Sequence, residues 1–407
     1  ELEEDAIALD GVVVSANRNE TTRRMAPTLV NVVDLKLFES TNSSTLSQGL
    51  NFQPGVRVET NCQNCGFQQV RINGLDGPYT QILIDSRPVF SALSGVYGLE
   101  QIPASIIERV EVMRGGGSAL FGSSAIAGTI NIITKEPLRN SSQLSHTITG
   151  FSGGNSFDNN TSLNLSLVTD DHRAGVYIFG QNRHRSGYDY DGDGFTELPK
   201  LKNQTVGFRA YFKTSTYSKL TFEYHHLQEF RRGGDMLNRP PHEANIAEQL
   251  EHAIDGGSLK FDYFSPNEKH RFSVFTSAAN TDRDSYYGGG QDPNAYGKTT
   301  DFTVMGGTQY MYSFGRCLFM PADLTAGLEY NRDHLEDNMW GYNRHTEQTV
   351  NIYSGFLQNE WKNEKWGILL GGRLDKHNMV DHVIFSPRAN PVSYTHLRAH
   401  ETDSYLV

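Results

Sequence analysis

The chain has 407 residues, a net charge of −11 and a sequence pI near 5.7. This acidic balance argues against a nucleic-acid-binding protein, and the absence of any run of about 18 apolar residues argues against a helical membrane protein. Only three cysteines occur, which excludes a scaffold built on disulfides.

Residues 1–137 contain short apolar runs, many glycines and two helix-like patches, and they predict a small mixed α/β domain. Ser43–Leu50 begins with good N-cap residues and places Leu46 and Leu50 four residues apart, as one face of a helix requires. A second short helix is predicted at Pro103–Ile107. The strand-like runs are Val12–Val14, Leu29–Val33, Gln69–Ile72, Gln81–Ile84, Val110–Met113 and Thr129–Ile133.

From about Leu138 the pattern changes to segments in which polar and apolar positions alternate. The leucines of Leu163–Leu167, for example, alternate with Asn164 and Ser166. Such alternation predicts strands with one apolar face, and about eleven candidate strands precede Pro391.

The connections between these strands alternate between short and long. Short turns on one side and long polar loops on the other are typical of outer-membrane barrels. The alternative is a soluble all-β protein with repeated hairpins. The short connections are predicted near Thr169–Arg173, Thr214–Ser218, Ser265–His270 and Lys362–Lys365, and the long ones at Ser186–Leu201, Arg231–Glu251, Asp284–Thr300 and Glu336–Thr349.

A glycine-rich loop separates two apolar strands near residue 117. Gly117 and Gly122 have the spacing of a phosphate-binding loop, but Ser123 stands where that loop needs its lysine. Nucleotide binding is therefore not expected, and the glycines predict a sharp structural turn.

Ordered motifs in residues 9–137 resemble the plug domain of TonB-dependent outer-membrane receptors. The strongest resemblance lies in residues 108–135, which contain ERVEVMRG, SALFG and AGTINIITK in turn. The rest of the chain, from about Leu138, resembles the barrel of this family in its alternation of polar and apolar residues rather than in any specific motif. Similar segments also occur earlier in the chain, with LDGVVVSA at 9–16, LNFQPGVRV at 50–58, RING at 71–74 and QILID at 81–85.

The resemblance implies a membrane β-barrel of antiparallel strands with an N-terminal α/β plug, and about half of a 22-stranded barrel present. It implies an outer-membrane location in a Gram-negative bacterium. Because Glu1 is acidic and no methionine precedes it, we expect no signal peptide and a mature form or fragment. The expected divisions are the end of a preceding segment at 1–8, a TonB box at 9–16, the plug at 17–137, the first half of the barrel at 138–391, and a non-native tail at 392–407 that resembles translated adapter sequence.

The apolar, β-prone segment near the N-terminus can add a strand to the edge of a partner's sheet. In the family that partner is periplasmic TonB, acting with ExbB and ExbD; the alternative is an ordinary first strand of the plug. The resemblance also implies contact with outer-membrane lipid, a small chelate ligand and a surface lipoprotein lid. The predicted TonB-binding residues are Leu9, Asp10, Gly11, Val12, Val13, Val14, Ser15 and Ala16.

Two loops are expected at the plug apex, where ligand would bind. The second, FSALSGVY, mixes aromatic and small residues, as a surface that contacts a bulky ligand would; the alternative is a mobile loop without that role. The predicted ligand-binding residues are Asn61, Gln63, Asn64, Phe67, Phe90, Ser91, Leu93, Ser94, Val96 and Tyr97.

Cys62 and Cys65 lie in the first of these loops. A C-x-x-C pair there can be a local disulfide, a soft-metal site or a redox pair. An oxidising cell-surface location favours the disulfide. A zinc site would need two further ligands, and the sequence has no second C-x-x-C.

An acidic loop is the best candidate for a calcium site. Asp189, Asp191 and Asp193 follow one another at every second position and precede Gly194, like the first half of a calcium loop, and Glu197 can supply another oxygen. Cobalamin receptors of the resembled family carry a similar stretch in an early loop. The alternative is a solvated acidic turn.

The plug charges Arg109, Glu111 and Arg114 are expected to pair with charges of the barrel wall, because a buried unpaired ion is costly. The resemblance implies such ionic locks between plug and barrel.

No catalytic triad, nucleophile elbow or zinc-protease motif appears, so no enzyme and no catalytic cofactor is expected. The function implied is TonB-dependent uptake of a scarce chelate, with cobalamin or another corrinoid first and a ferric siderophore or haem second. Another class is a surface ligand-binding module without transport. The histidines that could ligate haem iron are His184, His225, His226, His242 and His252.

Overall fold

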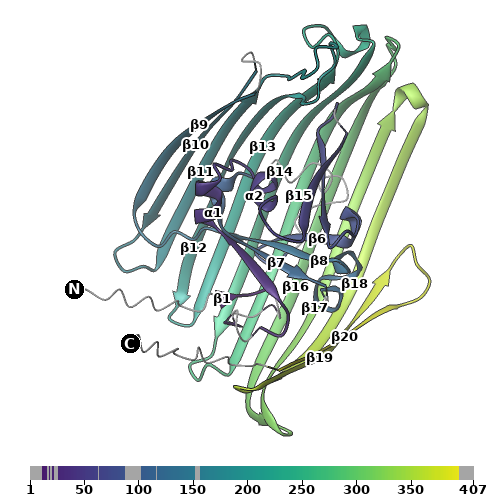
Figure 1. The fold of residues 1–407 in the computed structure, drawn as a ribbon. Helices are drawn as coiled ribbons and strands as arrows, with labels where there is room; N and C mark the ends of the chain where they lie inside the picture. Colours follow the sequence, from purple (N-terminus) through teal and green to yellow (C-terminus); the bar gives the residue numbers. More distant parts are fainter. Residues whose placement is uncertain are drawn as a thin grey trace, which may run out of the picture.

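The computed structural model describes residues 12–15, 18, 21–22, 26–62, 64–87, 102–115, 117–151 and 156–393. They form a small N-terminal domain and a large antiparallel sheet that curves around it (Figure 1). Among the helices of this described part, none has the length and apolar character needed to cross a membrane.

The N-terminal domain is built on a four-stranded sheet of order β3-β7-β8-β6, in which β6 and β8 run parallel. A separate hairpin pairs β4 with β5, and β1 pairs with β2. The strands are β1 (Val12–Val13), β2 (Thr21–Thr22), β3 (Val30–Asp34), β4 (Val56–Cys62), β5 (Phe67–Ile72), β6 (Thr80–Ile84), β7 (Ile107–Arg114) and β8 (Gly128–Thr134). The helices are α1 (Leu35–Ser40), α2 (Leu46–Leu50) and α4 (Ser118–Phe121), with the 3₁₀ turns η2 (Gly77–Tyr79), η3 (Ala104–Ile106) and η4 (Ser123–Ala125).

Both predicted helices of this domain are present, as α2 and the 3₁₀ turn η3, and each predicted strand is found within about three residues. Helix α1 was not predicted. It begins where the Asp34 side chain caps the N–H of Leu37 at 2.9 Å, and its Phe38 packs on Gly49 of α2. A β-carbon at Gly49 would lie 2.3 Å from the Phe38 ring, so the two short helices meet only because this residue is glycine.

The glycine-rich loop turns between β7 and β8 as its glycines predicted, with positive φ at Gly115 and Gly122. Gly128 opens β8 with φ +148°, and a β-carbon there would lie 2.1 Å from the carbonyl oxygen of Met113. Only glycine allows β8 to pair this closely with the end of β7.

The large sheet contains twelve strands, each paired antiparallel with the next in the chain. The sequence predicted about eleven. The strands are β9 (Ser141–Gly150), β10 (Phe157–Val168), β11 (Ala174–Arg185), β12 (Lys200–Ser215), β13 (Ser218–Gly234), β14 (Ile246–Phe264), β15 (His270–Gly289), β16 (Tyr296–Cys317), β17 (Met320–Met339), β18 (Arg344–Lys362), β19 (Trp366–His377) and β20 (Ile384–Ser393). Two 3₁₀ turns, η5 (Pro241–Glu243) and η6 (Trp340–Tyr342), lie in its connections.

The two faces of this sheet differ as the alternation predicted. On β10, Leu163 and Leu167 point outward and are exposed, whereas Ser162, Asn164 and Ser166 point inward and are buried. The outward face is therefore apolar and suited to lipid, and the inward face is polar and covered by the N-terminal domain.

The predicted long loops are shorter than expected because the strands run further. Asp284–Thr300 was predicted as a loop, but β15 extends to Gly289 and β16 begins at Tyr296. Likewise, only residues 340–343 separate β17 from β18. A strand needs only about 9–11 residues to cross a bilayer. Beyond it both faces meet a polar environment, so the alternation that marks a strand disappears from the sequence.

Two predicted segments lie wholly or mostly outside the described residues. Residues 1–8 are among them. Of the predicted tail, Val392 and Ser393 continue β20 and pair with Gly367 and Trp366 of β19, and residues 394–407 lie outside.

Candidate functional site

The C-terminal part of the predicted TonB box is anchored on a buried carboxylate. Glu111 lies in the middle of β7 and is fully buried. Its Oε2 accepts hydrogen bonds from the backbone N–H groups of Val14 and Ser15, both at 2.9 Å, and from the Ser15 hydroxyl at 2.7 Å. Asn131 of β8 donates to the same hydroxyl at 3.0 Å. Because charged acceptors make the strongest hydrogen bonds, Glu111 ties this segment to the centre of the sheet.

Of the predicted TonB-binding residues, Val12, Val13, Val14 and Ser15 are described. Val13 and Ser15 are buried and Val12 is exposed. Leu9, Asp10, Gly11 and Ala16 lie outside the described residues.

A second anchor is Arg18, which reaches from the N-terminal segment to the barrel wall. It forms an ion pair with Glu329 of β17, and Arg373 of β19 pairs with the same carboxylate at 2.7 Å. The Arg18 guanidinium also lies over the rings of Phe121 and Phe356, 4.7 and 4.8 Å from their centroids. One buried ionic cluster thus joins the N-terminal segment, the domain and two barrel strands.

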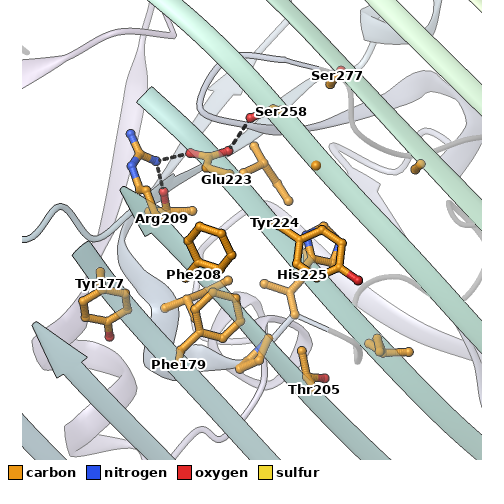
Figure 2. Close-up of a pocket in the computed structure, with 18 of the residues that line it drawn as sticks. Tyr177, Phe179, Thr205, Phe208, Arg209, Glu223, Tyr224, His225, Ser258 and Ser277 are labelled. Atoms are coloured by element: carbon orange, nitrogen blue, oxygen red, sulfur yellow. Dashed lines mark hydrogen bonds and ion pairs between the residues drawn. The ribbon is translucent and has the colours of Figure 1, made fainter. Parts of the chain in front are cut away.

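A third set of ionic contacts joins the far end of β6 to the wall. Arg209 of β12 pairs with Asp85, which follows β6, with Glu223 of β13 at 2.7 Å and with Glu136 at 3.3 Å. Lys219 also pairs with Glu136, at 3.0 Å. Figure 2 shows Arg209 directed at Glu223 from the neighbouring strand.

These contacts keep the acidic side chains of the domain ionised. Burial alone would raise the pKa of Asp85, but Arg209 and Arg87 hold it below its ordinary value. Burial likewise opposes ionisation of Glu136, and Lys219 and Arg209 lower its pKa in spite of it. The domain therefore meets the wall through charges that remain paired at neutral pH.

Beside this cluster lies a cavity of about 120 Å³ between the domain and the wall (Figure 2). Such a volume is below the roughly 300 Å³ of a small-ligand pocket, so we assign it to incomplete packing rather than to cargo. Its aromatic lining comes from Tyr177, Phe179, Phe208 and Tyr224 of the barrel, and its aliphatic lining from Ile84, Ile102 and Ile106 of the domain.

The first predicted apical loop lies against the barrel wall at the end with the long connections. A β-carbon on Gly233 of β13 would lie 2.0 Å from the carbonyl oxygen of Asn64, so the two backbones are in direct contact. Asn61 is exposed and donates to Gln69 at 2.6 Å, and Phe67 is partly buried. The other predicted apical residues, Gln63, Phe90, Ser91, Leu93, Ser94, Val96 and Tyr97, lie outside the described residues.

Cys62 and Cys65 are free thiols here, and the predicted disulfide is not formed. Cys62 donates a hydrogen bond to Oε2 of Glu248, on β14, at 3.0 Å. The pKa of the Cys65 thiol is raised, first by its hydrogen bond to Cys62 and then by burial. The sequence could not reveal this carboxylate, because it lies 186 residues further along the chain.

The loop between β11 and β12 brings the four predicted calcium ligands together, with their carboxylate oxygens within 4.8 Å of one another. The N–H groups of Gly192 and Gly194 hold the first carboxylate at 2.7 and 2.9 Å, and both glycines have positive φ. Four negative side chains this close repel one another unless a cation lies between them, and an all-oxygen set suits calcium. The four are Asp189, Asp191, Asp193 and Glu197.

Comparison with known proteins agrees with this architecture. Residues 22–129 match the family described as the TonB-dependent receptor plug domain. Over 125 residues the chain is 38% identical to the vitamin B12 transporter BtuB of Vibrio vulnificus (strain CMCP6). This match covers 31% of this chain and 20% of that protein. Residues 22–129 of this chain are therefore similar to the plug domain of TonB-dependent receptors.

Solved structures show the same fold for plug and barrel together. The siderophore receptor PirA from Acinetobacter baumannii superposes with a TM-score of 0.76 at 18% identity, over 91% of this chain and 59% of PirA. A mutant of the ferric enterobactin receptor PfeA from Pseudomonas aeruginosa gives 0.74 at 19%, over 90% and 60%. The ferric citrate transporter FecA gives 0.69 at 14%, over 91% and 60%.

The chain therefore spans about three fifths of these solved receptors. The predictions of a plug, of a partial antiparallel barrel and of an outer-membrane location are confirmed. The matched proteins are named as receptors and transporters, which agrees with the prediction that the chain is not an enzyme.

The prediction that Arg109, Glu111 and Arg114 pair with charges of the barrel wall was wrong. Arg109 pairs with Glu108 at 2.9 Å and with Glu111 at 3.0 Å, both within the plug. Arg114 donates to the carbonyl of Pro54, also in the plug. The physical reason is position: β7 is an inner strand of the plug sheet, so its charged side chains meet plug neighbours before they reach the wall.

The residues that do join plug and wall were missed by the sequence analysis. On the barrel they occupy inward-facing positions of strands, where a charge stands out against small polar neighbours. The sequence shows these charges, but it does not show which residue each of them contacts. They are Arg18, Asp85, Arg87 and Glu136 of the plug and Arg209, Lys219, Glu223, Glu329 and Arg373 of the barrel.

Proposed function

We propose that this chain is the plug and part of the barrel of a TonB-dependent transporter that takes up a scarce metal chelate. One observation carries the proposal: Val14 and Ser15, in the C-terminal part of the predicted TonB box, are hydrogen-bonded to Glu111 in the centre of the plug sheet. A partner that captured residues 9–16 and pulled would therefore act on β7 itself rather than on a loose tail.

In this mechanism periplasmic TonB, driven by ExbB and ExbD, adds a strand to residues 9–16. Its pull first loads the hydrogen bonds of Val14 and Ser15, and then the ion pair between Arg18 and Glu329. The first must break before the N-terminal segment can leave β7, and the second before Arg18 can leave the wall. Because each is buried and charged, breaking either one leaves an uncompensated charge in the interior, which is costly.

Cobalamin or another corrinoid is the first candidate for the cargo. Two observations support it: the 38% identity of the plug region to a vitamin B12 transporter, and the acidic loop between β11 and β12. A ferric siderophore is the second candidate, supported by the fold shared with siderophore receptors. Haem is the third; of its candidate ligands, His225 lines the small cavity and His252 pairs with Glu229 at 3.7 Å.

Calcium fits the acidic loop. Asp189, Asp191, Asp193 and Glu197 would hold the ion, and its charge would offset their mutual repulsion. The loop is packed through Tyr188, whose ring stacks on Phe151 at 5.2 Å. An ordered loop would then present a fixed surface to the cargo, together with the apical loop around Asn61 and Asn64.

Deletion of residues 9–16 from the receptor tests the transport proposal. Binding of cobalamin or a ferric chelate should persist and uptake into cells should cease. A surface-binding module without transport, the alternative of another class, predicts that the deletion changes nothing. A matched deletion elsewhere, such as residues 266–268 in the β14–β15 turn, controls for a general effect on the barrel.

Binding assays with cobalamin, haem and ferric siderophores, with and without calcium, separate the candidate cargoes. Tightest binding of cobalamin, strengthened by calcium, supports the first candidate. Tighter binding of a ferric siderophore or haem would reverse the order.

A further inference from the structure

The loop between β4 and β5 places two thiols and one carboxylate at a single point. Cys62 ends β4, Cys65 follows three residues later, and Glu248 is the third residue of β14. One ligand atom from each lies within 4.8 Å of the other two. Cys62 Sγ and Glu248 Oε2 lie 3.0 Å apart. The cluster therefore spans the boundary between plug and barrel.

The surroundings hold this loop in place. Cys65 packs against Leu250, which lies two residues beyond Glu248 on the same face of β14, and both are buried. Phe67 and Tyr287 cover the cluster in part. Cys62 and Glu248 remain partly exposed, so an ion can reach them.

Further contacts fix the loop to the neighbouring strand β13. The carbonyl oxygen of Gly66 accepts a hydrogen bond from Arg231 Nη1 at 3.3 Å, and Asn64 touches the backbone at Gly233. The backbone N–H of Cys65 donates to Cys62 Sγ at 3.2 Å, which fixes the turn between the two thiols. The three ligand side chains are thus brought together by packing rather than by chance proximity of flexible groups.

We propose that Cys62, Cys65 and Glu248 form a binding site for a thiophilic divalent cation, with zinc as the ion whose preferences they match. Two thiolates exclude calcium and magnesium, which take oxygen ligands. The carboxylate disfavours copper(I), which takes soft ligands only. Zinc accepts both kinds and is four-coordinate, so water would complete the set.

The geometry requires only a small adjustment. In a tetrahedral zinc site with bonds of about 2.0–2.3 Å, ligand atoms lie roughly 3.3–3.8 Å apart. On binding, each thiol loses its proton to solvent, so two protons are released for each ion and no electron is transferred.

The site and a disulfide exclude each other, because both use the same two sulfur atoms. Glu248 distinguishes them, since a disulfide has no need of a carboxylate 3.0 Å from one sulfur. A bound ion would connect the apical loop of the plug to β14. It would thereby hold that loop against the wall independently of TonB and of any cargo, so this inference stands apart from the transport proposal.

The test uses the detergent-solubilised receptor, reduced with a phosphine and freed of metal. Cobalt(II) is added as a spectroscopic probe and is then displaced by zinc. We expect one cobalt per receptor, with the near-ultraviolet charge-transfer absorption that thiolate ligands give. The variants Cys62→Ser and Cys65→Ser should lose most of this absorption. Glu248→Gln should keep it but weaken zinc binding at least tenfold, because one of three protein ligands is neutralised.

Cys317→Ser is the matched control, since Cys317 is the last residue of β16, at the other end of the barrel. It should bind cobalt and zinc as the unmodified receptor does. Zinc should also slow amide hydrogen exchange in residues 61–67 of the unmodified receptor and of Cys317→Ser, and much less in Glu248→Gln. This second measurement reports on the loop itself, so a variant that folds poorly does not decide the matter.

Three results would overturn the proposal. The first is the absence of thiolate-to-cobalt absorption in the reduced receptor. The second is zinc binding by Glu248→Gln with unchanged affinity, which would exclude the barrel ligand. The third is a Cys62–Cys65 disulfide in receptor alkylated directly in intact outer membranes, which would show that the natural state of the pair is oxidised.

Discussion

The hydroxyl of Ser15 lies 2.7 Å from Oε2 of Glu111, and the backbone N–H of the same serine lies 2.9 Å from the same oxygen. Two donors from one residue, joined by a third from Val14, converge on a single buried atom. Residues 14–15, within the predicted TonB box, are therefore fixed by one acceptor, and changes to that acceptor should release them.

Replacing Glu111 with Gln should free the N-terminal segment. The neutral amide is a weaker acceptor than the carboxylate, and hydrogen bonds to charged groups contribute about 1.5–3 kcal/mol each. We expect the amides of Val14 and Ser15 to exchange hydrogen roughly 10- to 100-fold faster, as measured by mass spectrometry. Ser15→Ala, which removes only the hydroxyl, should give a smaller increase; equal exchange in all three proteins would contradict the role of Glu111.

Replacing Arg18 with Ala should destabilise the plug–barrel contact by about 1–3 kcal/mol. The value is below the 3–5 kcal/mol of a fully broken buried pair because Glu329 keeps Arg373 as a partner. Arg18→Lys should recover only part of it, since a lysine cannot lie flat over Phe121 and Phe356. Thermal unfolding of the plug is the measurement, and full recovery by lysine would show that the stacking contributes nothing.

The stabilisation that the contact of Asp85 with Arg209 provides should be lost only as the pH falls. The pKa of Asp85 is lowered in the folded protein, so its stabilisation is complete above its unfolded value of about 3.9 and is lost as the pH falls through the lower folded value. We expect the resistance of the plug to protease to be constant from about pH 8 to 5 and to fall below about pH 4.

Asp85→Asn should lower the free energy of unfolding of the plug at neutral pH by about 1–3 kcal/mol. The protease resistance of the plug should fall accordingly, and it should depend less on acid. Asp76→Asn is the control, because the pair of Asp76 with Arg71 is largely exposed and such pairs contribute at most about 1 kcal/mol. An equal effect of the two substitutions would mean that the Arg209 cluster does not hold the plug.

Gly128→Ala should prevent the plug from folding. The added carbon would lie 2.1 Å from the Met113 carbonyl oxygen, and φ is +148°, so steric overlap and backbone strain act together and exceed about 3 kcal/mol. Gly74→Ala is the matched substitution, with positive φ but open space around it, and should cost about 1 kcal/mol. Denaturant unfolding compares the two, and similar costs would show that β7 and β8 can move apart.

Neutralising Asp191 and Asp193 together should abolish calcium binding to the loop between β11 and β12. Terbium luminescence sensitised by nearby tyrosines such as Tyr190 measures occupancy directly and needs no cargo. Asp292→Asn, in the connection between β15 and β16, should leave the titration unchanged. Terbium binding that survives the double substitution would place the cation elsewhere.

Periodicity revealed the barrel strands because each must present apolar side chains to lipid and polar ones to the interior, as β10 does. Periodicity did not predict the parts of β15 and β16 that extend beyond the bilayer, which were predicted as loop. No apolar face is required there, so the alternation is lost. Helix α1 was missed for a related reason: its six residues are too few to show a helical period, and its start depends on the single cap Asp34.

The sequence predicted which local residues lie together but not which distant residues they meet. The carboxylates of Asp189, Asp191 and Asp193 lie close together as predicted, because their spacing is local. Glu248 beside Cys62, and Arg209 beside Asp85, could not be found, because each pair joins residues more than a hundred positions apart. Arg109 was assigned to the barrel wall because its burial among plug neighbours depends on strand order, which the motif does not encode.

The order of strands in the plug sheet also determines where a mechanical load would concentrate. β7 has ladders on both sides, to β3 and β8, so tension entering at Glu111 is carried in shear by many hydrogen bonds at once. β6 is held within this sheet by β8 alone, over five register pairs, and its end is fastened to the barrel through Asp85 and Arg209. A pull on the N-terminal segment while β6 is held by the barrel would therefore separate β6 from β8. This separation would open a passage along one side of the barrel wall while the rest of the plug remains folded.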